Sequence, residues 1–322
     1  MGGSKKIMNF LDRVRGKIKK ELVRLKKRRL EIILYHFVTS EENIFTASGH
    51  NVQPDVFREQ IKYLSENFKV VPLARAKEII YGRSDDGPYA SVCFDDGYLN
   101  NIKEAYPILE EFKIPATLFV CPAVIGNQDI LWRDKIRYII NNNLAEKFIA
   151  FLKKSESGKY DFSTLEKKGF YAWSKKESAI KDMSIQKDLV DFFSFNNISA
   201  REIAEEHELY MGEDDVKNRE YLEFGNHTWS HPLMSCLSAT GQAEEIKKSH
   251  NYLKGKDLSP FTLSLPFAPY NEDTIKICQS LGYDFILDVN NDSNLVRKDK
   301  EDFLILHRKM APTTLKAFKK II

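Results

Sequence analysis

Short apolar runs alternate with amphipathic stretches along most of this chain. The apolar run at 32–38 is followed by a stretch in which Phe57, Ile61 and Leu64 recur at spacings of four and three residues, and Pro54 stands at its start. Apolar runs of this length predict buried strands, and the longer spacing predicts helices. By this pattern we expect strands at 32–38, 69–73, 90–94, 116–120, 222–226, 261–265, 284–289 and 303–306.

Amphipathic stretches fall between these runs, so strand and helix alternate. They lie at 74–81, 101–112, 272–281 and 315–322, with another that includes Ile246 and Leu253. Such alternation predicts parallel strands joined by right-handed crossovers, and the ionisable residues after several strands stand where a (β/α) barrel carries its active site. We therefore predict an α/β fold, a distorted or incomplete (β/α) barrel of about seven parallel strands, formed by 31–126 and 221–322.

The alternation fails between residues 127 and 220. This segment is charged and helix-forming, contains Trp132 and Trp173, and is too long for a loop in a compact domain. We interpret it as a helical insertion that leaves the end of a strand and could cover the active site. The alternative is a packing decoration remote from that site.

We predict that residues 1–30 form a separate unit, a basic amphipathic helix. Between residues 5 and 30, twelve Lys or Arg stand against two acidic residues, so a chain with a total net charge of +3 carries about −7 elsewhere. Apolar residues recur every three or four positions, at Ile7, Leu11, Val14, Ile18, Leu22 and Leu25. Such a helix can lie on an anionic membrane surface, or it can pack its apolar stripe on the barrel or on another chain.

Composition and charge exclude several classes of protein. With 43% hydrophobic residues the chain can bury a core, and the acidic balance outside residues 5–30 argues against a nucleic-acid partner. The four cysteines lack zinc-ribbon spacing and are expected to be free thiols in a reducing compartment. Since neither a secretory signal nor a membrane-spanning run is evident, we expect a cytoplasmic protein that residues 5–30 could bring to the inner membrane as a peripheral contact.

Two clusters of ionisable residues carry the candidate chemistry. Asp95 and Asp96 follow the apolar run at 90–94, and two carboxylates at the end of a buried strand need a cation or a strong donor between them. His227 and His231 are four residues apart, so on a helical turn they would project from one face toward one metal ion. With one carboxylate they form the three-ligand set with an open position that is typical of catalytic zinc. The alternative is a pair of histidines that serves packing or solubility.

The Phe-Asp-Asp-Gly motif at 94–97 and the His-x-x-x-His motif at 227–231 resemble those of the polysaccharide deacetylases, carbohydrate esterase family 4 with its NodB-homology domain. The resemblance implies that Asp96, His227 and His231 bind one divalent metal ion, for which zinc is our preferred assignment. It also implies that Asp95 is the general base, and that the backbone N–H of Phe267 stabilises the oxyanion.

The third motif departs from the family pattern of Arg-x-Pro-aromatic-Gly. Ser264 stands at the arginine position, and Ala268 stands at the glycine position. Arg308 could supply the missing cation, with a surface salt bridge as its alternative role. His307, after the apolar run at 303–306, is similar to the family histidine that protonates the leaving amine.

Three further residues are expected to bind the substrate. His36 follows the first apolar run and resembles family members that carry a histidine there, although a histidine satisfied by the backbone is the alternative. Pro266 precedes the proposed oxyanion donor in the third motif. Trp132 belongs to the helical insertion.

These residues predict a metal-dependent hydrolase that removes an N-acetyl group from an N-acetylated sugar, a saccharide precursor of a surface glycan. Two alternatives use the same pocket. One is a carbohydrate-binding pseudoenzyme, suggested by Ser264 and Ala268, and the other is a metal-dependent hydrolase of another non-peptide C–N bond. The expected partners are an N-acetylated saccharide and, through residues 5–30, a membrane surface.

Overall fold

The computed structural model describes residues 29–46, 51–82, 87–154, 160–163, 165–174, 183–267, 269–295 and 303–322. The basic helix predicted at 5–30 lies outside these residues except for Arg29 and Leu30, which begin the first strand. Ala268 also lies outside them. No helix among the described residues is long and apolar enough to cross a membrane.

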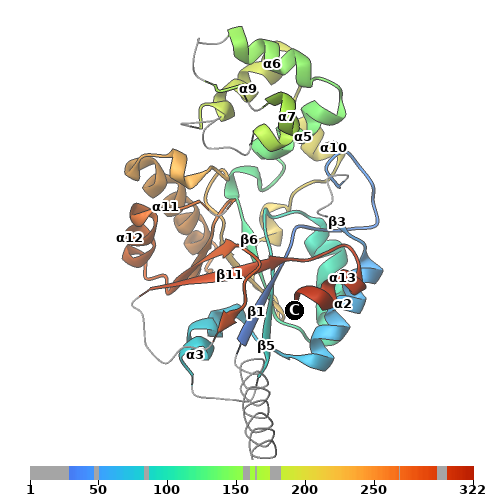
Figure 1. The fold of residues 1–322 in the computed structure, drawn as a ribbon, viewed down its shortest axis with the longest axis vertical. Coiled ribbons are helices and arrows are strands. Elements are labelled where there is room, and N and C mark those ends of the chain that lie inside the picture. Colours follow the sequence, from blue (N-terminus) through green and yellow to red (C-terminus); the bar gives the residue numbers. More distant parts are fainter. Residues whose placement is uncertain are drawn as a thin grey trace, which may run out of the picture.

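Seven parallel strands form a closed barrel in the described part of the chain (Figure 1). Their order around the barrel is β1-β11-β9-β8-β7-β6-β5, and pairing of β1 with β5 closes the ring. This confirms the predicted (β/α) barrel of about seven strands. The strands are β1 (Arg29–Tyr35), β5 (Tyr89–Phe94), β6 (Ala116–Val120), β7 (Leu222–Asn226), β8 (Thr262–Ser264), β9 (Phe285–Val289) and β11 (Leu304–Met310).

Four shorter strands accompany the barrel among the described residues. The expected strand at 69–73 is reduced to β4 (Lys69–Val70), which pairs with the start of β5, and β10 (Asn294–Leu295) runs antiparallel to β1. A separate pair joins β2 (Phe37–Val38) to β3 (Asn51–Val52). Sequence reasoning did not predict β3 or β10, because two residues are too few to show a periodic pattern.

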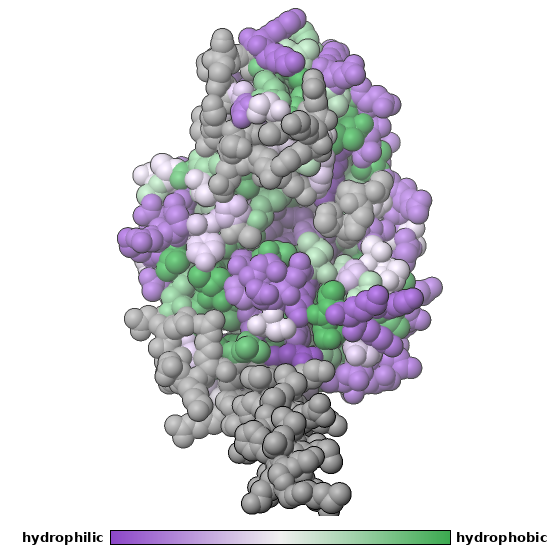
Figure 2. Space-filling model, in the orientation of Figure 1, coloured by the Kyte–Doolittle hydropathy of each residue, from purple (hydrophilic) through white to green (hydrophobic). Residues whose placement is uncertain are grey.

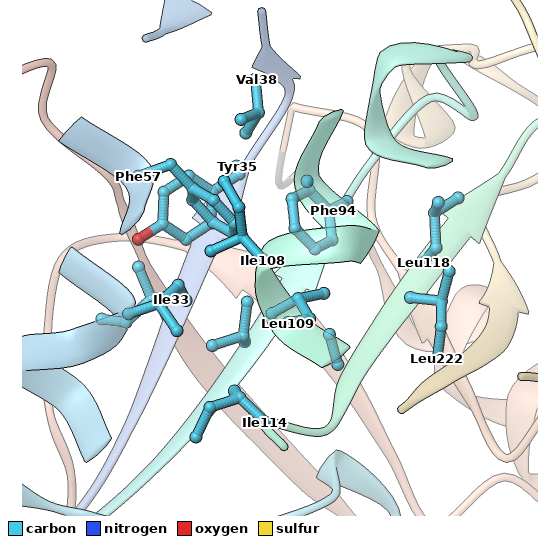
Figure 3. Packing of buried hydrophobic residues seen from close by; sticks show 14 of the residues in the cluster. Ile33, Tyr35, Val38, Phe57, Phe94, Ile108, Leu109, Ile114, Leu118 and Leu222 are labelled. Carbon is cyan, nitrogen blue, oxygen red and sulfur yellow. The ribbon is translucent and has the colours of Figure 1, made fainter. Parts of the chain in front are cut away.

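Helices pack on the outside of the barrel, and Figure 3 shows part of that contact. Phe57 on one helix and Ile108 on another meet Tyr35 of β1, Phe94 of β5 and the neighbouring strands in one buried cluster. Full burial of one such side chain stabilises the fold by ~1.5–3 kcal/mol. The outer helices are α2 (Pro54–Asn67), α3 (Ala76–Tyr81), α4 (Tyr106–Phe112), α11 (Ala239–Gly255), α12 (Glu272–Ser280) and α13 (Leu315–Ile321).

The barrel interior is filled by the opposite face of the same strands. Leu34 of β1 and Leu306 of β11 belong to the buried cluster on this inner face. Because side chains alternate along a strand, the next positions on the inner face are His36 after β1 and Arg308 in β11. By the same alternation, Asp95 is the next inner position after β5. Ionisable groups from three strands are therefore directed into one end of the barrel.

The segment between β6 and β7 is mainly helical in its described residues and lies beyond one end of the barrel (Figure 1). Its own core contains Ile136, Phe148, Trp173 and Phe192, which explains its aromatic content. Hydrophilic and hydrophobic side chains are interspersed on the molecular face in Figure 2. The helices of this insertion are α5 (Trp132–Asn141), α6 (Ala145–Lys154), α7 (Leu165–Trp173), α9 (Ile185–Phe195) and α10 (Ala200–Glu206).

Candidate metal centre and active site

A sharp turn after β5 brings two neighbouring carboxylates into one cavity. Asp95 and Asp96 follow directly after Phe94, and both line that cavity. The turn uses left-handed backbone conformations at Asp96 (φ 74°) and Gly97 (φ 83°), the second of which glycine adopts at little cost. In a continued strand the two side chains would point to opposite faces, so the turn lets both reach the site.

Asp96, His227 and His231 converge as predicted for a metal centre. Oδ1 of Asp96 lies 3.4 Å from Nε2 of His227 and 3.3 Å from Nε2 of His231. Ligands ~2.1 Å from a tetrahedral ion are separated by ~3.4 Å, so these separations fit one ion among the three groups. Oδ1 of Asp96 and Nε2 of His227 are buried and have no hydrogen-bond partner among the described residues, which also fits a site built for a cation.

The two histidines lie on an extended loop after β7, so the prediction of a helical turn is wrong. Thr228 (φ 66°) and His231 (φ 63°) have left-handed backbone conformations, which a helix excludes. Nδ1 of His227 lies 2.8 Å from the carbonyl oxygen of Ser264, so Nδ1 carries the proton and Nε2 is left for the metal. The hydroxyl of Thr228 accepts a hydrogen bond from the backbone N–H of His231 at 3.1 Å.

Glu245 of α11 holds the same loop from behind. Its carboxylate accepts hydrogen bonds from the backbone N–H groups of Trp229 (2.9 Å) and Ser230 (2.8 Å), and from the Ser230 hydroxyl at 2.8 Å. Burial raises the pKa of Glu245, although these donors oppose that shift. A half-buried carboxylate thus fixes two of the three residues between His227 and His231.

Asp95 is held as an ion by two side chains that the family motif does not specify. Nη1 of Arg308 donates to Oδ1 of Asp95 at 2.8 Å, and the hydroxyl of Ser264 donates to the same oxygen at 3.1 Å. Arg308 is fully buried, so this ion pair is not a surface salt bridge. Burial acts to raise the pKa of Asp95, but Arg308 and then His227 outweigh it, and the pKa lies below its ordinary value.

The other ionisable groups differ in the charge that they favour. Burial lowers the pKa of His231 to about 3 despite nearby Asp96, so this imidazole is neutral and able to bind a metal. Burial would also lower the pKa of His227, but Asp95 and Asp96 raise it above its usual value. Burial acts to raise the pKa of Asp96, but the interactions with His231 and the other nearby histidines outweigh it, so the pKa of Asp96 is lowered. The shifts of Asp96 and His231 therefore favour the forms that bind a divalent ion, whereas His227 must release the proton on Nε2 when an ion binds.

These residues open on a cavity of about 350 Å³, large enough for a sugar unit. His36 lines it, with Nε2 3.9 Å from Oδ2 of Asp96, and Phe267 lines it with its ring 4.8 Å from that of His231. The insertion supplies three polar lining residues that sequence reasoning missed, Arg133, Arg137 and Tyr171. Nothing in their local sequence marks them, since only the fold brings the insertion to the barrel end.

A hydrogen-bonded cluster joins the insertion to the turn that carries the carboxylates. Asp134 of α5 accepts hydrogen bonds from the hydroxyls of Tyr98 and Tyr210, and it pairs with Arg137. Tyr98 follows Gly97 directly, and its ring stacks on that of Phe37 at 3.9 Å. The insertion is therefore tied to the site itself, which argues against the alternative of a remote decoration.

The structure places His307 outside the cavity, whereas the sequence predicts that His307 protonates the leaving amine. Arg308 occupies the interior face of β11, so strand alternation turns His307 to the outer face, where its Nδ1 lies 2.7 Å from Oδ1 of Asp288. His307 does not line the cavity described above. The alternation of Leu304 and Leu306 in the sequence was the signal that could have excluded it.

Two of the expected substrate contacts are also corrected. Trp132 is buried beneath the site, where its indole N–H donates to the carbonyl oxygen of His231 at 2.7 Å, and it does not line the cavity. Trp132 is therefore a support of the metal-binding loop. Pro266 is buried between Leu265 and Phe267 and likewise does not line the cavity, although both of its neighbours do.

Fold and site together define a (β/α)-barrel protein in which one Asp and two His side chains could hold a metal ion, with a buried carboxylate beside them. The family model described as polysaccharide deacetylase matches residues 82–146 and 200–286, on both sides of most of the insertion. Over these two stretches the chain is similar to the polysaccharide deacetylase family.

Individual relatives show how far the likeness extends. The poly-beta-1,6-N-acetyl-D-glucosamine N-deacetylase of Staphylococcus aureus is 30% identical over 161 residues, 48% of this chain and 52% of the relative. The chain spans about half the length of the curated relatives that it matches.

Solved structures show the same fold at low sequence identity. The Streptococcus pyogenes deacetylase PplD, in complex with acetate, matches with a TM-score of 0.52 at 17% identity over 91% of this chain and 97% of that one. A polysaccharide deacetylase from Bacillus cereus matches with a TM-score of 0.53 at 16% identity, over 91% of this chain and 69% of that one.

Proposed function

We propose that this protein is a metal-dependent N-deacetylase that hydrolyses the N-acetyl group of an N-acetylated saccharide. The observation that carries the proposal is the ionised, buried Asp95 beside the convergent ligand set of Asp96, His227 and His231. A general base next to a metal site with an open position is the combination that metal-assisted hydrolysis requires.

The ligands favour zinc as the resident metal. One carboxylate and two neutral imidazoles form the mixed O/N set that zinc accepts in catalytic sites. When bound there, the ion supplies Lewis-acid polarisation of a carbonyl and lowers the pKa of a water molecule to ~7. The hydrogen bond from His227 Nδ1 to Ser264 keeps Nε2 available for this ion.

Asp95 is the proposed general base. Its Oδ1 is occupied by Arg308 and Ser264, while Oδ2 faces His227 at 3.6 Å and remains on the metal side of the carboxylate. Asp95 thus takes a proton from the attacking water through Oδ2 while Arg308 keeps it ionised beforehand. The carbonyl oxygen of the acetamide gains negative charge in this step, and we assign the backbone N–H of Phe267 as its protein donor.

His36 replaces His307 as the proposed acid that protonates the leaving amine. It lines the cavity on the side of Asp96, whereas His307 pairs with Asp288 outside it. Burial lowers the pKa of His36, with Asp96 opposing, so its protonated form would be a strong acid toward the amine.

The substrate is proposed to be an N-acetylated saccharide of a surface glycan or its precursor. The Staphylococcus aureus relative is named for an N-acetyl-D-glucosamine polymer, which supports an N-acetylhexosamine unit as the group that enters the cavity. The Arg308–Asp95 pair also weighs against the pseudoenzyme alternative, because it provides the cation that Ser264 lacks.

Acetate release from short oligomers of N-acetyl-D-glucosamine tests this function. We expect the zinc-loaded protein to release acetate, and the Asp95→Asn variant to release it ~10²–10⁴ times more slowly with its metal retained. Release of another acyl group or of ammonia from non-sugar amides, without acetate from any N-acetylated saccharide, would instead identify a hydrolase of a different C–N bond.

A further inference from the structure

Arg133 of the insertion presents an isolated positive charge to the catalytic cavity. The residue is only 4% exposed and lines the cavity together with the metal-binding groups. Its guanidinium is surrounded by aromatic rings, 4.8 Å from the centre of Trp132, 4.4 Å from Tyr171 and 5.4 Å from Phe267. These rings fix the plane of the guanidinium but supply no neutralising charge.

Three of the five N–H donors of Arg133 are unused. Nη1 donates to the hydroxyl of Ser174 at 2.7 Å, whereas Nε and Nη2 have no hydrogen-bond partner among the residues described here. Nε–H and the nearer N–H of Nη2 point in the same direction from one edge of the guanidinium. This edge forms the two-pronged donor that matches two oxygens of a carboxylate or phosphate.

The other two arginines that line the cavity already have anionic partners. Arg308 pairs with Asp95 and Arg137 pairs with Asp134, while no ion pair involves Arg133 in the described part of the chain. Burial lowers the pKa of Arg133 to about 10, against an opposing effect of Tyr171, so the group is charged at neutral pH. A buried cation without an anion destabilises a fold, which points to a ligand that neutralises it.

We propose that Arg133 binds an oxyanion group of the saccharide substrate, a carboxylate or a phosphate, next to the acetamide that is hydrolysed. The ring of Phe267 contacts both Arg133 and His231, so the anion-binding edge adjoins the metal centre within one cavity. This inference rests on the proposed deacetylase function for the identity of the neighbouring group. It predicts that the enzyme prefers acidic N-acetylated sugars to neutral ones.

Matched pairs of substrates test the preference. Acetate release is measured for N-acetylglucosamine, N-acetylmuramic acid, which adds a carboxylate, and N-acetylglucosamine 1-phosphate, which adds a phosphate. Wild type should favour at least one anionic sugar by about 10- to 100-fold in kcat/KM, the range for a charged two-pronged hydrogen bond. The anionic sugar that is preferred shows whether the site binds a carboxylate or a phosphate.

Three variants assign that preference to Arg133. Arg133→Met should reduce the ratio of kcat/KM for the anionic sugar to that for the neutral sugar to near one. Arg133→Lys keeps the charge without the two-pronged edge and should keep an intermediate ratio. Arg201→Met removes an exposed arginine of the same insertion and should keep the wild-type ratio. An unchanged ratio in Arg133→Met, or a wild-type preference for the neutral sugar, would overturn the proposal.

A binding measurement keeps the inference separate from the deacetylase function. The melting temperature of metal-free protein is recorded with inorganic phosphate and with chloride at equal ionic strength. Phosphate should raise it more for wild type than for Arg133→Met, while equal shifts would count against an anion site. If no sugar releases acetate but the shifts differ, the deacetylase proposal fails and the anion site stands.

Discussion

Arg308 is the residue on which the chemistry of Asp95 depends most directly. The family pattern supplies an arginine at the position of Ser264, whereas here Ser264 donates a hydroxyl and Arg308 supplies the cation from β11. The charge reaches the same carboxylate from a different strand. The departure in the third motif is thereby compensated in space, although Ala268 lies outside the described residues.

Substitution of Arg308 by Gln should shift the pH dependence of activity. Arg308 helps to hold the pKa of Asp95 below its ordinary value, so its loss raises that pKa and protonates the base at higher pH. The acidic limb of kcat/KM should move to higher pH, and activity should recover partly as pH rises. A pH profile of acetate release measures this shift.

Stability must be followed in the same experiment, because removing one partner of a buried ion pair costs about 3–5 kcal/mol. Arg308→Lys keeps the charge and should move the limb less. If both variants fold and the acidic limbs of their pH profiles coincide with that of wild type, Arg308 does not set the pKa of Asp95.

Substitutions of His36 and His307 test which of these histidines protonates the leaving amine. His36→Gln should lower kcat by ~10²–10⁴-fold with metal retained, because the leaving amine loses its proton donor. His307→Gln should change kcat less than about twofold, since its ring lies outside the cavity against Asp288. Steady-state kinetics and metal analysis of both variants test this assignment. A large loss of kcat in His307→Gln and a small one in His36→Gln would identify His307 as the acid.

Sequence motifs predict the metal-binding residues better than the residues around them. Asp95, Asp96, His227 and His231 stand out because their chemistry is local to two short motifs. The outward position of His307 was missed because motif matching ignored strand alternation. Arg133 could not be found, since its role depends on which element the insertion packs against.

At the scale of elements, α11 positions the metal-binding loop through one carboxylate. Glu245→Ala should weaken metal affinity by ~10–100-fold, because the backbone at Trp229 and Ser230 loses its anchor. Glu244→Ala, on the exposed side of the same helix, is the matched control and should leave affinity near wild type. Competition with a chromophoric chelator gives both values, and equal affinities would show that α11 does not hold the loop.

Strands were predicted more accurately than the loops that connect them. The ranges 116–120 and 222–226 match β6 and β7 residue for residue. The sequence of β6 is a nearly continuous apolar run, as expected for a buried parallel strand. The loop at 227–231 was mistaken for a helical turn because a spacing of four fits a helix. Its left-handed residues, Thr228 and His231, carry no reliable sequence signal.

At the scale of the molecule, the insertion and the barrel share one site. Sequence indicated a helical segment at 127–220 that could lie over the active site, and its residues Arg133, Arg137 and Tyr171 line the cavity. The hydrogen bond of Tyr98 with Asp134 joins the two parts. The cavity is therefore formed by two parts of the chain that the sequence pattern had separated.

Removal of residues 1–28 tests the predicted membrane contact, which lies outside the described residues. The first barrel strand begins at Arg29, so this deletion leaves β1 intact. We expect unchanged acetate release from soluble substrates and less sedimentation with anionic vesicles, and salt should weaken binding of the full chain because the Debye length is only ~8 Å at about 0.15 M. A melting temperature lower by several degrees would assign the segment to packing instead.

The most direct test of the account is the metal stoichiometry of wild type, Asp95→Asn and His231→Ala, measured on the same preparations as acetate release. Wild type should bind one divalent ion per chain and turn over, and it should lose and regain activity with chelation and zinc. Asp95→Asn should bind one ion without turnover, and His231→Ala should do neither. Full activity in metal-free wild type, or one tightly bound ion in His231→Ala, would contradict a metal-dependent deacetylase built on Asp96, His227 and His231.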